Sequence, residues 1–139
     1  MIRIPNASLQ GFKRYHDHVA NVIANRGTAA PKLEVKPNAS DADTVDLFLY
    51  DEIGFWGVTA RMFIDELERI ESPTINLRIN SPGGEVFDAI AIYNALKRHD
   101  AKIITTVDGL AASAASYIAQ AGEEVRMGEG TFMMIHRAW

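Results

Sequence analysis

The chain has 139 residues, of which 47% are hydrophobic and 23% charged, and it contains no cysteine. This length fits one domain, and the composition excludes collagen-like, disulfide-rich and wholly disordered chains. The formal net charge of −4 gives no basic footprint for nucleic acid, so no nucleic-acid partner is expected. The lack of cysteine also excludes thiolate metal sites and cysteine nucleophiles.

The sequence has no apolar run long enough for a membrane-spanning helix and no apolar signal segment after Met1. We therefore expect a cytoplasmic protein with no membrane partner.

Residues 1–44 differ from the rest of the chain and are expected to form an N-terminal arm and linker. Apolar residues recur at helical spacing from Leu9 to Ile23, which predicts a short amphipathic helix. The stretch from Asn25 to Thr44 has no apolar period and is rich in Ala, Pro, Asn, Asp and Lys, so it predicts a linker or exposed loop. His16 and His18 are two possible metal ligands, but in a polar arm we expect both to be solvated, and we expect no metal site.

From residue 45 to 139, strand and helix signals alternate, which predicts a second region with an α/β fold and a mainly parallel sheet. The helix over about 86–98 carries apolar residues on two faces and is expected to lie deep in the structure. In such folds, ligands meet the carboxyl ends of strands and the helices that follow. The expected strands are 45–50, 75–79, 103–107 and 131–135, and the other expected helices run from a cap at Thr59 to before Pro73 and over about 113–121.

The first candidate junction is Ile79-Asn-Ser-Pro-Gly-Gly-Glu-Val86. Two glycines between a strand and a helix can expose backbone N–H groups to an anion, including the oxyanion of acyl transfer. Taken alone, Pro-Gly-Gly is more simply a tight turn.

The second junction, Asp108-Gly-Leu-Ala-Ala-Ser-Ala-Ala-Ser-Tyr117, places Ser113 where a helix should begin. Taken alone, this serine is best interpreted as a helix N-cap. The functional interpretation makes its hydroxyl a nucleophile at a strand-to-helix turn, where small alanine neighbours let substrate approach. Ser116 is a competing candidate, but it lies one turn into the helix, where packing is the simpler role.

The third feature is His136, which ends an apolar strand and can therefore enter a cleft. A lone histidine there is more often structural, yet a hydroxyl nucleophile needs a base that titrates near neutrality. A glycine loop, a serine and a histidine in this order together favour nucleophilic catalysis. No phosphate loop or dinucleotide fingerprint is present, and no cofactor is expected.

Three motifs together resemble the Clp protease proteolytic subunit family, within the Clp/crotonase superfamily. They are Ile79-Asn-Ser-Pro-Gly-Gly84, Gly109-Leu-Ala-Ala-Ser113-Ala and Met134-Ile-His136, and the similarity covers about 45–139. The ending His136-Arg-Ala-Trp139 looks more like the phage and prophage branch, whose members are often head-maturation proteases.

The resemblance implies a crotonase-like β-β-α spiral and peptide-bond hydrolysis without ATP at the peptidase core. It makes Ser113 the nucleophile and His136 the base, with the backbone N–H groups of Gly84 and Ala114 binding the oxyanion. Substrate would lie near Gly83 and Ile79 as an added strand. The implied partners are a polypeptide substrate, further copies in a ring-type homo-oligomer, and phage capsid or scaffold proteins.

The family's acidic third residue follows the histidine by several dozen positions, and Glu123, Glu124 and Glu129 do not match its motif. We therefore expect this chain, which reads as incomplete after its histidine, to have little or no turnover. Two alternatives remain open. One is a non-catalytic subunit that binds peptides or assembles with a partner, and the other is a crotonase-type acyl-thioester enzyme.

Overall fold

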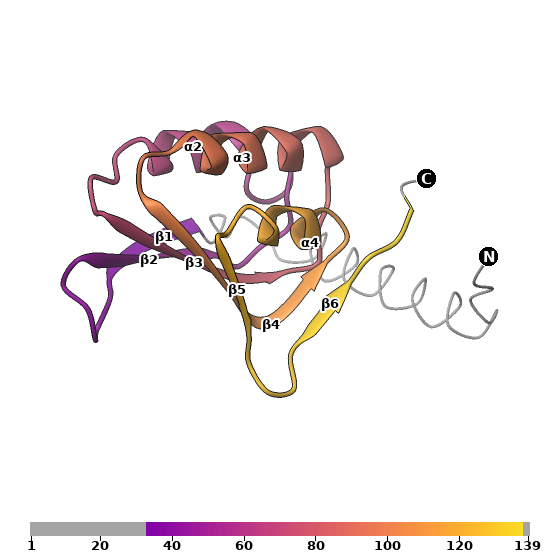
Figure 1. Cartoon of the computed structure of the whole chain (residues 1–139). Coiled ribbons are helices and arrows are strands. Elements are labelled where there is room, and N and C mark those ends of the chain that lie inside the picture. The colour runs from indigo at the N-terminus through magenta and orange to yellow at the C-terminus, as the bar shows by residue number, and fades with distance from the viewer. Residues whose placement is uncertain (1–32, 138–139) are drawn as a thin grey trace. The chain divides into compact units, whose positions relative to one another are not determined.

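A computed structural model describes residues 33–137, which form a six-stranded sheet and three helices (Figure 1). The expected amphipathic helix, the histidines of the arm and Trp139 lie outside these residues. Along the chain, the elements are β1 (Leu33–Pro37), β2 (Thr44–Leu49), α2 (Ala60–Leu67), β3 (Thr74–Ser81), α3 (Val86–Arg98), β4 (Lys102–Ala112), α4 (Ala114–Ala119), β5 (Glu124–Met127) and β6 (Phe132–Met134).

The sheet is mostly parallel, as the alternation of strands and helices predicts. Its order is β1-β2-β3-β4-β5, and β6 pairs with the far end of β4. Only β1 runs antiparallel to its neighbour; the pairs β2–β3, β3–β4, β4–β5 and β4–β6 are parallel. A parallel pair needs a crossover, and α2, α3 and α4 supply three of these on the same side of the sheet (Figure 1).

The core lies between these helices and one face of the sheet. Leu47, Leu77 and Ile79 are fully buried there, and Phe63 and Ile92 contribute from α2 and α3. Burying each such side chain contributes about 1.5–3 kcal/mol to folding. None of the helices within residues 33–137 has both the length and the apolar character needed to cross a bilayer.

The helix starts and ends follow local chemistry. The Thr59 hydroxyl accepts a hydrogen bond from the Met62 N–H at 3.2 Å and so caps α2, as the sequence predicts. The bounds of α3 match the expected 86–98, but its second apolar face is only partly buried, because Val86 is 42% exposed and Ile90 and Tyr93 are half-buried. The prediction that this helix lies deep is therefore correct for the face of Ala89, Ile92 and Leu96 and holds only in part for the other.

Two strands were not expected. Leu33–Pro37 pairs with β2 as β1, so the interpretation of this stretch as linker or loop is wrong there. Leu33 and Val35 pack against the core, which stabilises a strand that shows only a short alternation in the sequence. Glu124 begins β5, which lies between the expected helix 113–121 and the expected strand 131–135, and this strand is exposed along its whole length.

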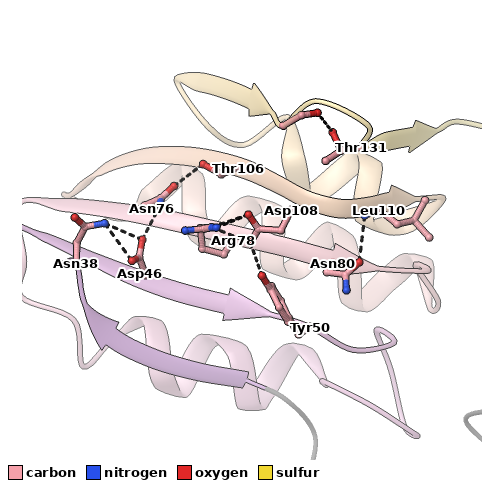
Figure 2. Close-up of polar contacts among 11 residues, drawn as sticks. Asn38, Asp46, Tyr50, Asn76, Arg78, Asn80, Thr106, Asp108, Leu110 and Thr131 are labelled. Atoms are coloured by element: carbon pink, nitrogen blue, oxygen red, sulfur yellow. Dashed lines mark hydrogen bonds and ion pairs between the residues drawn. The ribbon is translucent and has the colours of Figure 1, made fainter. Parts of the chain in front are cut away.

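Strand β4 is longer than expected and has a bulge near its carboxyl end. Ile79 pairs with Val107, but Ser81 pairs with Ala111, so β4 uses more residues than β3 over this interval. The Asn80 side chain lies at the irregular step, where its Oδ1 accepts a hydrogen bond from the Leu110 N–H at 3.2 Å (Figure 2). A Cβ on Gly109 would lie 2.7 Å from the same oxygen. The bulge therefore fixes how far β4 extends beyond β3.

The sheet face away from the helices carries a polar network (Figure 2). Asp46 is 8% exposed and accepts hydrogen bonds from Asn76 at 2.6 Å and from Asn38 at 3.1 Å. Thr106 donates to the Asn76 side-chain oxygen at 2.7 Å. These bonds join β2, β3 and β4 side by side and compensate for burial of the Asp46 carboxylate.

Candidate active site

Ser113 follows β4 directly and has an unusual backbone conformation. Its φ is 52° and its ψ is −122°, and it is the one non-glycine residue with positive φ between Leu33 and Arg137. Such a conformation costs about 1–3 kcal/mol and persists only where the surroundings impose it. Ser113 stands at the N-cap position of α4, but its side chain makes no capping hydrogen bond, so the hydroxyl is not used for helix capping.

Strand β6 brings His136 to this serine. It runs parallel to β4 with Ala112 opposite Met134, and the Ser113 N–H donates to the Met134 carbonyl at 2.8 Å. Because both strands continue in the same direction, the residues that follow lie side by side. Ser113 Oγ and His136 Nε2 are 2.7 Å apart, which is hydrogen-bond distance. The two residues, 23 positions apart in sequence, therefore form a hydroxyl–imidazole pair.

The glycine turn after β3 lies against the same backbone. Gly83 is buried with φ 91°, and a Cβ there would lie 2.8 Å from Ser113 Cβ and 2.9 Å from the Ala114 nitrogen. The Ser81 hydroxyl accepts a hydrogen bond from the Gly83 N–H at 3.1 Å and helps to hold the turn. Only a residue without a side chain allows this approach.

Gly84 is exposed, and its own N–H points away from Ile53. A parallel bridge joins Ile53 to Gly84 through the Gly83 carbonyl and the Glu85 N–H, each in a 2.9 Å hydrogen bond with Ile53. In such a bridge the middle residue directs its N–H to the opposite side. The bridge with Ile53 thus does not use the Gly84 N–H, and Gly84 belongs to the turn that touches Ser113.

The alanines around Ser113 have a packing role. Ala112 and Ala114 are 1% and 7% exposed, so their methyl groups pack inside the protein. Their small size lets α4 lie close to β4. Ser116 is 6% exposed, and its hydroxyl donates to the Ser113 carbonyl at 2.6 Å.

The remaining predicted residues lie apart from the serine–histidine pair. Ile79 is fully buried and is paired on both sides, with Leu49 and Val107, so it cannot receive an added strand, contrary to our expectation. Of the acidic residues after Ser113, Glu124 makes a bidentate ion pair with Arg126 at 2.8 and 2.9 Å on the exposed strand β5.

A second polar cluster lies on the outer sheet face and was not predicted. Arg78 makes a bidentate ion pair with Asp108, whose other partner is the Tyr50 hydroxyl (Figure 2). Burial, followed by the hydrogen bond to Asp108, raises the pKa of Tyr50 to about 12, and the hydrogen bond to Asp108 raises the pKa of Arg78. Polar residues at every second position of β3, namely Thr74, Asn76, Arg78 and Asn80, were the available signal for this cluster.

The sequence and its fold are similar to known proteases. Residues 46–139, more than half of the chain, match the Clp protease family model. The chain is 32% identical over 97 residues to the ATP-dependent Clp protease proteolytic subunit 3, chloroplastic, of Arabidopsis thaliana, covering 63% of this chain and 31% of that protein. It is also 32% identical over 99 residues to the ATP-dependent Clp protease proteolytic subunit of Pleurastrum terricola, covering 63% and 50%. The matches thus span half or less of these curated relatives.

Solved structures agree with this similarity. A ClpP1 N165D mutant from Listeria monocytogenes superposes with a TM-score of 0.60 at 27% identity, covering 67% of this chain and 56% of that one. The ClpP protease catalytic domain from Plasmodium falciparum gives a TM-score of 0.59 at 31% identity, covering 66% and 53%. With the family model and the serine–histidine geometry pointing the same way, the chain belongs to the Clp protease family.

Proposed function

We propose that this protein is a serine peptidase core, with Ser113 as nucleophile and His136 as general base. The observation that carries the proposal is the 2.7 Å hydrogen bond between Ser113 Oγ and His136 Nε2 at a strained turn. A hydroxyl is a weak nucleophile until a neighbouring base accepts its proton, and this distance lies within the range for that transfer. Family membership supports peptide bonds as the substrate class.

In the proposed mechanism, Ser113 Oγ attacks the carbonyl carbon of the scissile peptide while its proton passes to His136 Nε2. The tetrahedral intermediate then collapses, the C–N bond breaks, and His136 gives the proton to the leaving amine. Water, activated by the same imidazole, hydrolyses the acyl-enzyme and regenerates the serine hydroxyl. No metal or cofactor is part of this sequence.

The backbone N–H groups of Gly84 and Ala114 are the proposed donors to the oxyanion. Support for Gly84 comes from its exposed position and from its N–H, which the bridge with Ile53 does not use. Support for Ala114 comes from its place directly after the nucleophile and next to Gly83. Donors already in place at the site of developing charge typically contribute about 100-fold or more in rate each.

The finer assignments are also part of the proposal. The His136-Arg-Ala-Trp139 ending favours a phage or prophage head-maturation role, with capsid or scaffold polypeptides as substrates and a ring-type homo-oligomer in the cytoplasm. The aligned Ser113–His136 pair favours a peptidase over a non-catalytic subunit, because peptide binding alone does not require this geometry. It also disfavours a crotonase-type acyl-thioester enzyme, which does not use such a pair.

The test is covalent labelling with a fluorophosphonate probe, from which a reactive serine displaces fluoride in a single event without turnover. We expect stoichiometric labelling located at Ser113 by peptide mass spectrometry, and no labelling of Ser113→Ala. His136→Ala should slow labelling by about 100-fold or more, because the base is lost.

Ser72→Ala is the matched control, since it removes an exposed hydroxyl that donates to the Asp43 carbonyl, far along the chain from this site. Its labelling should equal that of the wild type. Equal labelling of wild type and Ser113→Ala, or no labelling of the folded wild type, would overturn the assignment.

A further inference from the structure

The carbonyl of Ser113 is held by two donors from the same residue. The Ser116 hydroxyl donates to this oxygen at 2.6 Å, and the Ser116 N–H donates to it at 3.0 Å. Ser116 is 6% exposed, so both bonds form in a largely water-free environment, where hydrogen bonds are strong. The carbonyl that they hold belongs to the residue with the strained backbone.

This carbonyl and the Ala114 N–H belong to one peptide group. A peptide group is planar and trans, so its C=O and N–H point in opposite directions. Any contact that fixes the direction of the Ser113 oxygen therefore fixes the direction of the Ala114 hydrogen. Ser113 needs such support, because at φ 52° and ψ −122° its backbone has no intrinsic preference for this orientation.

We propose that Ser116 is a positioning residue, whose hydroxyl aims the Ala114 N–H at the oxyanion by anchoring the Ser113 carbonyl. Ser116 touches neither substrate nor reacting atoms in this role. The inference rests on the proposed function, since it assumes that Ser113 is the nucleophile and Ala114 a donor. It assigns to Ser116 a specific share in transition-state stabilisation in place of simple packing.

The test compares Ser116→Ala with wild type in fluorophosphonate labelling over a range of probe concentrations, which separates the limiting rate, kinact, from the probe affinity, KI. In this reaction the serine oxygen bonds to phosphorus, its proton passes to His136, fluoride leaves, and the phosphoryl oxygen occupies the oxyanion position. We expect kinact to fall about 10-fold, less than for full loss of a donor, because the Ser116 N–H still holds the carbonyl. KI should stay within about twofold, because probe binding does not depend on charge development.

Thr105→Val is the matched control. The Thr105 hydroxyl is also buried and also donates to a backbone carbonyl of α4, at 2.8 Å, but that carbonyl belongs to Ala119 at the other end of the helix. We expect its kinact to equal that of the wild type, with rates expressed per mole of folded protein by circular dichroism. Ser116→Thr should retain most of the wild-type kinact, because a helical threonine can direct its hydroxyl to the carbonyl three residues earlier.

The outcomes separate this inference from the proposed function. If wild type is labelled at Ser113 and Ser116→Ala reacts equally fast, the positioning role is refuted while the nucleophile assignment stands. The positioning role is also refuted if Thr105→Val loses as much kinact as Ser116→Ala, or if Ser116→Ala changes only KI. A kinact of Ser116→Thr as low as that of Ser116→Ala would refute it as well. If folded wild type is not labelled at Ser113, both proposals fail together.

Discussion

Replacing Gly83 with alanine tests the close packing of the glycine turn against the nucleophile. The added Cβ would lie 2.4 Å from the Ala112 carbonyl oxygen and 2.8 Å from Ser113 Cβ, and the residue would have to keep a φ of 91°. Backbone atoms cannot rotate away as a flexible side chain can. The substitution should therefore displace the turn from Ser113.

The expected loss of stability in Gly83→Ala has two parts. A left-handed backbone costs a residue with a Cβ about 1–2 kcal/mol. Forcing extra volume into a packed region costs about 1–3 kcal/mol more. We expect the free energy of unfolding of Gly83→Ala to fall by roughly 2–5 kcal/mol in urea titrations.

Gly130→Ala isolates the cost of a left-handed backbone from the cost of close packing. Gly130 has a comparable φ of 78°, but a Cβ there would meet no atom within 4 Å. Its loss should be only about 1–2 kcal/mol, so the two variants should differ by about 1–3 kcal/mol. Fluorophosphonate labelling should drop in Gly83→Ala and stay unchanged in Gly130→Ala. Equal destabilisation by the two substitutions would refute the argument that close approach, and not only backbone strain, requires glycine at position 83.

Two further predictions concern the outer sheet face. Asn76→Ala should lower the free energy of unfolding by about 1–3 kcal/mol, because the buried Asp46 carboxylate loses its 2.6 Å donor. Asn38→Ala removes the longer 3.1 Å donor to the same carboxylate, so an equal or greater loss of stability in Asn38→Ala would contradict this. Tyr50 has a folded pKa of about 12 against an ordinary value of 10.0, so its neutral form is favoured by folding, and this contribution is complete below pH 10 and lost as pH rises through 12. The difference in free energy of unfolding between wild type and Tyr50→Phe should therefore shrink between pH 10 and pH 12 in urea titrations. A constant difference would show that folding does not raise the pKa of the Tyr50 phenol.

The sequence predicted the parallel α/β architecture because β2, β3 and the helix 86–98 have clear apolar patterns that burial on one face explains. It did not predict β1 or β5, because short edge strands owe their structure to pairing with a neighbour, which no local pattern shows. Nor did it predict the length of β4. That strand continues past Gly109, where Asn80 of β3 accepts the Leu110 N–H and β6 pairs with Leu110 to Ala112, and none of these partners is close in sequence.

For the candidate site, the motifs identified Ser113, His136 and the glycine turn but not the contacts between them. Ser113 was most simply an N-cap in the sequence, and only the fold shows its hydroxyl bonded to His136 instead of the helix. The strain at Ser113 and the contact of Gly83 with it depend on three chain segments at once. Ile79 was misjudged because its apolar run was interpreted as an accessible edge, whereas β3 is a central strand.

The bulge in β4 limits which insertions and deletions this strand can accept. From Ile79 to Ser81, β3 advances by two residues (81 − 79), while β4 advances by four from Val107 to Ala111 (111 − 107). The excess is even, and Val107 and Ala111 are both fully buried, which fits side chains that alternate between faces with a period of two. Inserting or deleting one residue between them would turn the end of the strand over and carry Ser113 away from His136, whereas a change of two would keep the inside and outside faces in phase. Between Val107 and Ala111, only insertions or deletions of an even number of residues are thus expected to keep Ser113 next to His136.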